Sequence, residues 1–205
     1  TALTIAVEKS NLEIVNKLLS IEGIDPSLVD SNNQTALNIA IIKQEIEICN
    51  KILDFYGENL KDQTSQLNKA IKMILLLYSP NNNMKNISIQ NKYGNKHIFG
   101  NKSSFGNKMK QNNKIDQKMI PILKRILEVE NVDLNCVEDN YSILSFACKI
   151  NEASLVEYLL KNDKVKVNLK DPKEGNTALI VSILNENYDI AKMLIEHSGT
   201  DLNIS

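Results

Sequence analysis

The stretch TALIVSILNENYDIAKMLI, residues 177–195, decides the fold, because the rest of the chain repeats its pattern. It reads as a short helix that Leu179 opens, a turn, and a second helix that carries the aliphatic residues Met193, Leu194 and Ile195. The offset of 15 residues that separates Leu179 from Leu194 recurs three more times, between Leu3 and Leu18, Leu37 and Ile52, and Leu144 and Leu159. A chain that repeats one helix–turn–helix unit in this way is predicted to be a stack of such units.

One further copy of the unit emerges only when a long insertion is allowed. Ser65–Ile71 fits the opening, and the matching aliphatic stripe is Ile122, Leu123, Ile126 and Leu127, so about 44 extra residues separate the two helices. We therefore expect five units, at about 1–29, 30–60, 61–135 with an insertion at 80–117, 136–168 and 169–205. Thr35 is expected to cap a helix, Gly57 to close one, and Pro121 to fit the first turn of the resumed helix.

The inserted segment has a different composition from the rest of the chain. Residues 81–118 contain eight lysines and one acid, which gives them a net charge of +7 and leaves −8 on the remainder. An aromatic–Gly–Asn–Lys unit recurs every six residues, at Tyr93, Phe99 and Phe105. So few aliphatic residues cannot offset the entropy of ordering, and we expect no fixed structure.

Four interpretations of this segment stay open. It binds nucleic acid by charge and stacking, or it binds an anionic membrane by charge alone. It is a low-complexity expansion without a role, or it folds back on the acidic remainder of the chain and screens the partner-binding face.

The overall composition indicates a layered helical protein without a deep core. Of the 205 residues 42% are hydrophobic, only 5% are aromatic and none is Trp, so the core is built from small aliphatic side chains. The net charge of −1 gives no indication of a nucleic-acid partner. Cys49, Cys136 and Cys148 lack metal-ligand spacing and are expected to be buried reduced thiols, which favours a cytoplasmic location. No apolar run is long enough to span a membrane. Thr1 already falls inside the first unit, so we expect the chain to be part of a longer protein.

The repeated motifs resemble those of the ankyrin repeat family. The resemblance lies in the openings Thr35–Ile41 and Thr177–Ile180, the paired aliphatics of Leu155–Leu160, and the ending Val132–Asn135, and it covers about 165 residues. It implies an all-α fold, a solenoid of stacked helix–turn–helix units joined by β-turn or hairpin loops. The family's Pro and His in the opening are replaced here, and its Gly between the helices is replaced by Ser10, Gln44, Asn151 and Asn187. These changes predict looser repeats with the same fold.

The resemblance also implies a function, that of a non-catalytic protein–protein interaction scaffold. In the family, partners contact the turn tips and the inner face of the first helices. The residues at those positions are Ser31, Asn32, Gln34, Ile42, Lys43, Glu138, Asp139, Tyr141, Lys149, Ile150, Lys173, Glu174, Asn176, Leu184 and Asn185. Tyr141, Ile42, Ile150 and Leu184 are the strongest candidates, because aromatic and apolar residues on an exposed face indicate a binding patch.

Catalytic patterns are not found in the sequence. His97 and His197 have no cysteine or acid at triad or metal-ligand spacing, and no glycine-rich phosphate loop follows a strand. We therefore expect no catalytic residue, cofactor or metal, and a monomer that binds a protein partner. The alternative of another class is that the chain is the recognition or targeting module of a larger enzyme.

Overall fold

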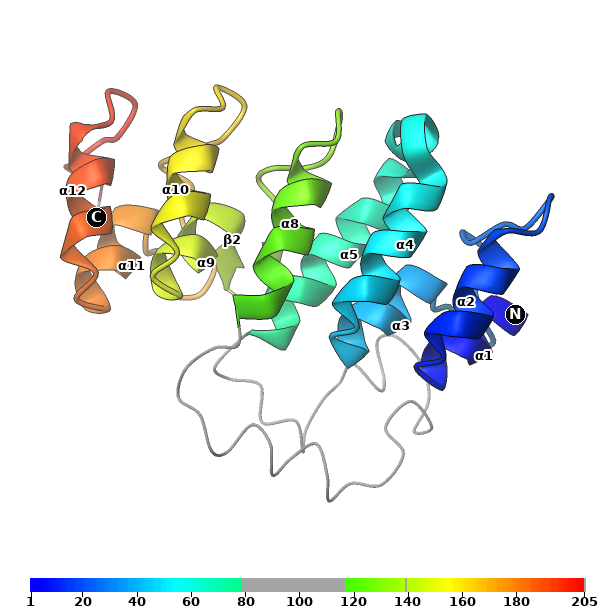
Figure 1. The fold of residues 1–205 in the computed structure, drawn as a ribbon. Helices are drawn as coiled ribbons and strands as arrows, with labels where there is room; N and C mark the ends of the chain where they lie inside the picture. Colours follow the sequence, from blue (N-terminus) through cyan, green and yellow to red (C-terminus); the bar gives the residue numbers. More distant parts are fainter. Residues whose placement is uncertain (79–116, 139, 205) are drawn as a thin grey trace, which may run out of the picture. The chain divides into compact units, whose positions relative to one another are not determined.

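The computed structural model describes residues 1–78, 117–138 and 140–204, and the chain forms two compact units, Thr1–Val132 and Asp133–Ser205. The insertion expected at 80–117 lies outside the described residues except for its last position, and so does Asp139. Both units consist of pairs of short helices, and a tight turn joins the two helices of every pair except the one that residues 79–116 separate (Figure 1).

Within its described residues, the first unit contains three helix pairs. Its elements are α1 (Ala2–Glu8), α2 (Leu12–Leu19), α3 (Ala36–Lys43), α4 (Ile46–Tyr56), the 3-10 helix η1 (Gly57–Gln63), α5 (Thr64–Leu77), the 3-10 helix η3 (Gln117–Met119) and α8 (Ile120–Leu127). Helix α3 packs between α1 and α5, and helix α4 packs between α2 and α8 (Figure 1). The first helices of the pairs, which we call inner, thus form one layer, and the second helices, which we call outer, form the other.

The second unit contains two helix pairs and a short hairpin. Its elements are β1 (Val137–Glu138), β2 (Tyr141–Ser142), α9 (Ile143–Lys149), α10 (Ala153–Leu160), α11 (Ala178–Leu184) and α12 (Tyr188–Glu196). The inner helices α9 and α11 pack together, as do the outer helices α10 and α12. The two strands pair antiparallel, with Glu138 opposite Tyr141.

Four of the five inner helices begin in the same way. A hydroxyl side chain accepts a hydrogen bond from the amide three residues later, which satisfies one of the unpaired donors of the first turn. The capping residues are Thr1, Thr35, Ser142 and Thr177. The prediction for Thr35 is therefore confirmed. Helix α5 differs, because it follows η1 and has no side-chain cap.

Two other predictions about helix ends are confirmed. Gly57 ends α4 with a φ of 47°, a conformation that costs glycine little because it has no Cβ. Pro121 lies in the first turn of α8, where its missing N–H removes no helical hydrogen bond.

The outer helices carry the aliphatic stripes that form the core. The stripe residues of α4 and α8 are at most 3% exposed, namely Ile48, Cys49, Ile52, Leu53, Ile122, Leu123, Ile126 and Leu127. Stripe residues on the first and last pairs are not all covered, since Ile14 is 46% exposed and Ile195 is 50% exposed. Burial of a stripe residue therefore depends on a helix pair packing against it, which its own sequence does not decide.

A residue with positive φ joins the two helices of four pairs. These residues are Ser10, Gln44, Asn151 and Glu186, with φ between 53° and 59°. The sequence analysis put Asn187 at the position of the family's glycine, and this is wrong, because the φ of Asn187 is −86° and the left-handed residue is its neighbour Glu186. The side-chain amide of Asn187 instead donates to the main-chain carbonyl of Cys148 at 2.7 Å, which ties the turn to helix α9.

Asparagines at the repeat endings link successive connections in the second unit. The Asn135 side chain accepts from the Lys166 amide at 2.6 Å and donates to the Lys164 carbonyl at 2.8 Å. Asn168, which is 33 residues later, accepts from the Asp201 amide at 2.9 Å and donates to the Gly199 carbonyl at 2.9 Å. The repeated Val-x-x-Asn ending therefore supplies the hydrogen bonds between one connection and the next.

Candidate functional site

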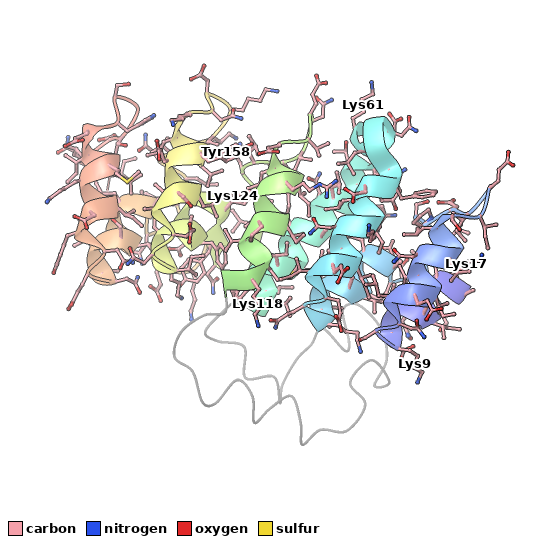
Figure 2. All side chains as sticks on the ribbon, viewed as in Figure 1. Lys9, Lys17, Lys61, Lys118, Lys124 and Tyr158 are labelled. Carbon is pink, nitrogen blue, oxygen red and sulfur yellow. The ribbon has the colours of Figure 1, made fainter. Side chains whose placement is uncertain are left out.

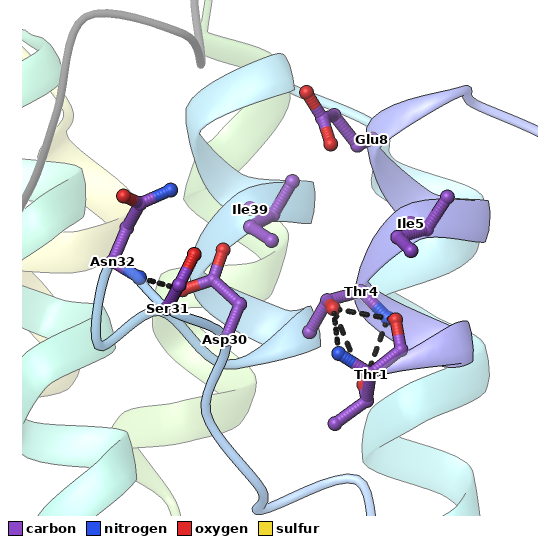
Figure 3. Close-up of a pocket in the computed structure, with 8 residues that line it drawn as sticks. All are labelled: Thr1, Thr4, Ile5, Glu8, Asp30, Ser31, Asn32 and Ile39. Atoms are coloured by element: carbon purple, nitrogen blue, oxygen red, sulfur yellow. Dashed lines mark hydrogen bonds between the residues drawn. The ribbon is translucent and has the colours of Figure 1, made fainter.

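A pocket of about 390 Å³ opens on the inner-helix side of the first unit, and we call it the α1–α3 pocket (Figure 3). Helix α1, helix α3 and the turn before α3 each contribute to its wall. The lining residues are Thr1, Thr4, Ile5, Glu8, Asp30, Ser31, Asn32 and Ile39. Two of the expected partner-binding residues, Ser31 and Asn32, thus lie in one pocket with six residues that were not expected there.

The turn that forms one wall is built around Asp30. One carboxylate oxygen of Asp30 accepts from the main-chain amides of Asn32 at 2.8 Å and Gln34 at 2.9 Å. This arrangement is the usual way in which aspartate holds a turn. Within the described residues, the other carboxylate oxygen of Asp30 accepts no hydrogen bond.

The opposite wall is the exposed side of α1. Thr1 and Thr4 satisfy each other, since the Thr4 hydroxyl donates to the Thr1 carbonyl and the Thr1 amino group donates to the Thr4 hydroxyl, both at 2.8 Å. Ile5 is 58% exposed. The main-chain carbonyl of Glu8 accepts from Lys43 Nζ at 2.8 Å, while its carboxylate forms no ion pair in the part of the chain that the structure describes.

The pocket therefore combines negative charge with apolar surface. Figure 3 shows Ile39 between Glu8 and Asp30, with Ile5 beside it on α1. Both carboxylates are partly buried, which weakens solvent screening of their charge. Such a surface suits a ligand that is cationic at one end and aliphatic along its length.

In the second unit, two expected residues come together at the hairpin. Lys149 at the end of α9 places its Nζ 2.5 Å from the hydroxyl of Tyr141 and 3.9 Å from the centre of the Tyr141 ring. The contact is a cation–π interaction supplemented by a hydrogen bond. It holds both half-buried side chains in place beside Glu138, which pairs with Tyr141 across the strands.

The second turn of this unit is built around Asp171, which is only 6% exposed. Its two carboxylate oxygens accept from the main-chain amides of Lys173 at 3.1 Å, Glu174 at 2.7 Å and Asn176 at 3.0 Å. Lys173 and Glu174 are exposed at the tip, and the Asn176 side chain donates to Glu174 at 3.0 Å. The three expected residues therefore form one presented turn, whose central carboxylate is already satisfied.

Several expected partner-binding residues are not available at the surface. Ile42, Ile150 and Gln34 are buried, with exposures of 3%, 7% and 1%, so the expectation that they are exposed is wrong. Ile42 and Ile150 pack inside their units, because the end of the inner helix is covered there. Lys43 is half-buried and already binds the Glu8 carbonyl.

Two expected residues at the end of α11 are exposed, and one lies outside the description. Leu184 is 66% exposed, and Asn185 is exposed while its side chain donates to the Val181 carbonyl at 2.7 Å. Asp139 is outside the described residues. Of the eight lysines in 81–118, only Lys118 is described, and it is exposed at η3 (Figure 2). The nucleic-acid, membrane and fold-back hypotheses for that segment therefore also lie outside the described residues.

The pocket residues on α1 could have been found from the sequence by alignment of the repeats. Glu8 follows Leu3 at the same offset of five residues that separates Leu37 from Ile42. The residues at this position in later repeats, Ile42, Lys149 and Leu184, were predicted to bind a partner, but Glu8 was not. Asp30 begins a turn cluster, but the sequence gives no sign that it faces α1.

The thiols are held in a state that disfavours nucleophilic chemistry. Cys49, Cys136 and Cys148 are buried thiols outside any disulfide. Burial, with a smaller contribution from the charge of Glu45, raises the pKa of Cys49 to about 12, and burial raises the pKa of Cys148 to about 12. Because a thiolate is the reactive form, both are inert near neutral pH.

The described residues contain neither a candidate metal site nor a candidate membrane-spanning helix. Residues 1–78, 117–138 and 140–204 contain no group of three or more His, Cys, Asp and Glu side chains placed to hold a metal ion. In the same ranges no helix combines the length and apolar character needed to cross a membrane.

Comparisons with known proteins point to one family. A family model described as ankyrin repeats (3 copies) matches residues 1–66 and 114–205. The I-Kappa-B like protein C2 of Microplitis demolitor bracovirus (isolate Webb) is 45% identical over 38 residues, which are 18% of this chain and 21% of that protein. The putative ankyrin repeat protein FPV031 of Fowlpox virus (strain NVSL) is 34% identical over 84 residues, which are 40% of this chain and 24% of that protein.

These similarities cover only part of each curated relative, and one solved structure resembles the chain along most of its length. The regions that match these two curated relatives span less than a quarter of the length of each. Among solved structures, the crystal structure of the ankyrin repeat protein EF0377 is 19% identical, with a TM-score of 0.44 and coverage of 96% of this chain and 98% of that one. The family assignment rests on the family model and on the helix pairs described above.

Proposed function

The chain belongs to the ankyrin repeat family, and on this premise we propose that it is a non-catalytic scaffold that binds a protein partner through its turn tips and inner helices. Ankyrin repeats are generally protein–protein interaction modules, and a stack of helix pairs offers extended surfaces instead of an enclosed cleft. The observation that carries the proposal is the α1–α3 pocket, where Ser31 and Asn32 meet the exposed side of α1.

The partner-binding surface that we propose contains the exposed and half-buried members of the expected set. They are Ser31, Asn32, Lys43, Glu138, Tyr141, Lys149, Lys173, Glu174, Asn176, Leu184 and Asn185. Tyr141 is the strongest of these in the second unit, because an aromatic ring held by Lys149 offers contact area at little cost in side-chain entropy. Each unit presents its own part of this surface.

Three coarser features complete the proposal. The three buried thiols, none of them in a disulfide, favour a reducing, cytoplasmic compartment. We propose that the chain acts as a monomer, and that it divides into five repeats at about 1–29, 30–60, 61–135, 136–168 and 169–205. The pairs α1–α2, α3–α4, α5–α8, α9–α10 and α11–α12 support this division.

Site-specific photo-crosslinking tests the proposal. A benzophenone side chain is placed at Ser31 or Lys173 on the turns, and the matched controls carry it at Lys17 or Lys161, which are exposed on the outer helices α2 and α10. We expect the turn positions to capture one protein from an extract of the source cells, and unlabelled chain to compete for it. Capture that is equal from the outer helices, or absent from both turns, would contradict the proposal.

A further inference from the structure

The α1–α3 pocket carries a more specific inference about the partner, which rests on the function proposed above. We propose that this pocket receives the side chain of a lysine or arginine of the partner. The carboxylates of Glu8 and Asp30 attract the cationic end, and Ile5 contacts the aliphatic stem.

The first step of the argument is charge. Glu8 and Asp30 line the same pocket, and the lysine that contacts Glu8 does so at the main chain and not at the carboxylate. Lys43 Nζ donates to the main-chain carbonyl of Glu8 at 2.8 Å. Two partly buried carboxylates without an ion-pair partner among the described residues disfavour an anionic ligand and favour a cation.

The second step is the state of the Asp30 carboxylate. Asp171 builds the corresponding turn of the second unit and uses both of its oxygens on main-chain amides. Asp30 uses only one, so within the described residues its second oxygen keeps its capacity to accept. Both aspartates thus stabilise their turns through main-chain amides, but only Asp30 keeps a carboxylate oxygen that accepts no hydrogen bond from the turn.

The third step is the apolar floor. Ile5 lines the pocket from α1 and is 58% exposed, so its side chain is accessible to a ligand. An exposed isoleucine in the same pocket as two carboxylates suits a side chain whose stem is apolar and whose tip is charged, as in lysine and arginine. A bare metal ion would leave this surface unused, and two carboxylates supply too few ligands for it.

The fourth step is size. A pocket of about 390 Å³ falls in the range of about 300–1,000 Å³ that is typical of ligand sites. This volume is sufficient for one long side chain with its solvating water. The pocket therefore defines a subsite for one residue of a partner, and the remaining contacts come from the rest of the turn and helix surface.

Titration with single-residue probes, followed by the NMR shifts of the backbone amides, tests this inference. The probes are N-acetyl-arginine amide, N-acetyl-lysine amide and the uncharged analogue N-acetyl-norleucine amide. We expect saturable shifts at Ser31, Asn32 and the end of α1 with a cationic probe. Norleucine should bind at least about fivefold more weakly, and added salt should weaken the cationic probes because the attraction is electrostatic.

Two variants make the test specific. Glu8→Gln keeps the shape and removes the charge, and it should weaken the cationic probes at least about fivefold; Glu13→Gln on the exposed side of α2 should leave them unchanged. Equal binding of norleucine and arginine, unchanged binding by Glu8→Gln, or shifts that map elsewhere would overturn the inference. If Glu8→Gln still crosslinks the same partner from Ser31 with unchanged affinity, the pocket inference fails while the scaffold function stands.

Discussion

The main-chain amide of Met119 donates a hydrogen bond to the hydroxyl of Tyr78 at 3.3 Å, although 41 residues separate them in the chain. Tyr78 follows the last turn of α5, and Met119 ends η3 directly before α8. The two residues are 9% and 0% exposed, so the bond lies inside the first unit. The described residues on either side of positions 79–116 are therefore held close together.

This closure predicts that a short linker can replace the segment. A variant in which eight Gly and Ser residues replace residues 79–116 should fold, and it should be about 1 kcal/mol more stable, because loop-closure entropy falls by about 0.6 kcal/mol for each halving of length. Urea unfolding followed by circular dichroism measures the change. Loss of the cooperative transition in the linker variant would show that α5 and α8 need the natural segment to pack.

The turn between α11 and α12 predicts opposite effects at two neighbouring positions. Glu186 has a φ of 59°, which costs most residues roughly 1–2 kcal/mol, so Glu186→Asn should stabilise the protein by about 0.5–1 kcal/mol. Asn187→Ala should destabilise it by about 1 kcal/mol, because it removes the hydrogen bond to the Cys148 carbonyl. Thermal and urea unfolding of both variants measure the changes in stability. Destabilisation by Glu186→Asn together with stabilisation by Asn187→Ala would contradict the assignment of Glu186 as the left-handed residue.

Burial predicts a difference between two isoleucines that share one position in the repeat. Ile39→Ala should cost about 2–5 kcal/mol, the range for a buried aliphatic residue, since Ile39 is 2% exposed. Ile5→Ala should cost less than about 1 kcal/mol, because Ile5 is 58% exposed. The free energies of unfolding of the two variants provide the comparison, and equal costs would mean that Ile5 is covered in solution.

The buried thiols predict a loss of stability at alkaline pH. The pKa of Cys49 is raised by burial, and to a smaller extent by the charge of Glu45, from 9.0 to about 12. Above pH 9 the unfolded chain loses this proton while the folded protein keeps it, so rising pH favours unfolding up to about pH 12. Between pH 8 and pH 10 the free energy of unfolding of the wild type should fall by about 1 kcal/mol more than that of the Cys49→Ala variant.

Urea unfolding at the two pH values measures this difference. A second arm with Cys148→Ala should behave alike, because burial raises the pKa of Cys148 in the same way. An identical pH dependence of the wild type and both variants would show that the thiols do not carry the effect.

The asparagine links predict a local role for Asn168. Replacement by Ala removes one hydrogen bond accepted from the Asp201 amide and one donated to the Gly199 carbonyl, and should cost about 1–2 kcal/mol. Amide hydrogen exchange should rise at Asp201 and spare the amides of α9. Unchanged protection at Asp201 would show that the link is not formed in solution.

The candidate site shows which features the repeat pattern can predict and which it cannot. Ser31 and Asn32 were expected because turn tips follow from the repeat frame, and the structure places them in a pocket. Ile42 was expected on the same grounds but is buried, because whether the end of an inner helix is covered depends on its neighbours. Asp30 was missed because a turn-forming aspartate gives no sign in the sequence of which helix it faces.

The sequence by itself determined the repeat, the identity of the helices and the capping residue Thr35, because these follow from periodicity and from bonds between residues three apart. Only the tertiary structure decided which members of each stripe are covered, that Glu186 and not Asn187 takes the left-handed conformation, and that Glu8 and Asp30 line one pocket. The physical reason is that short-range bonds are encoded within a few residues of chain, whereas burial and the meeting of two charges depend on which helix pair packs against which.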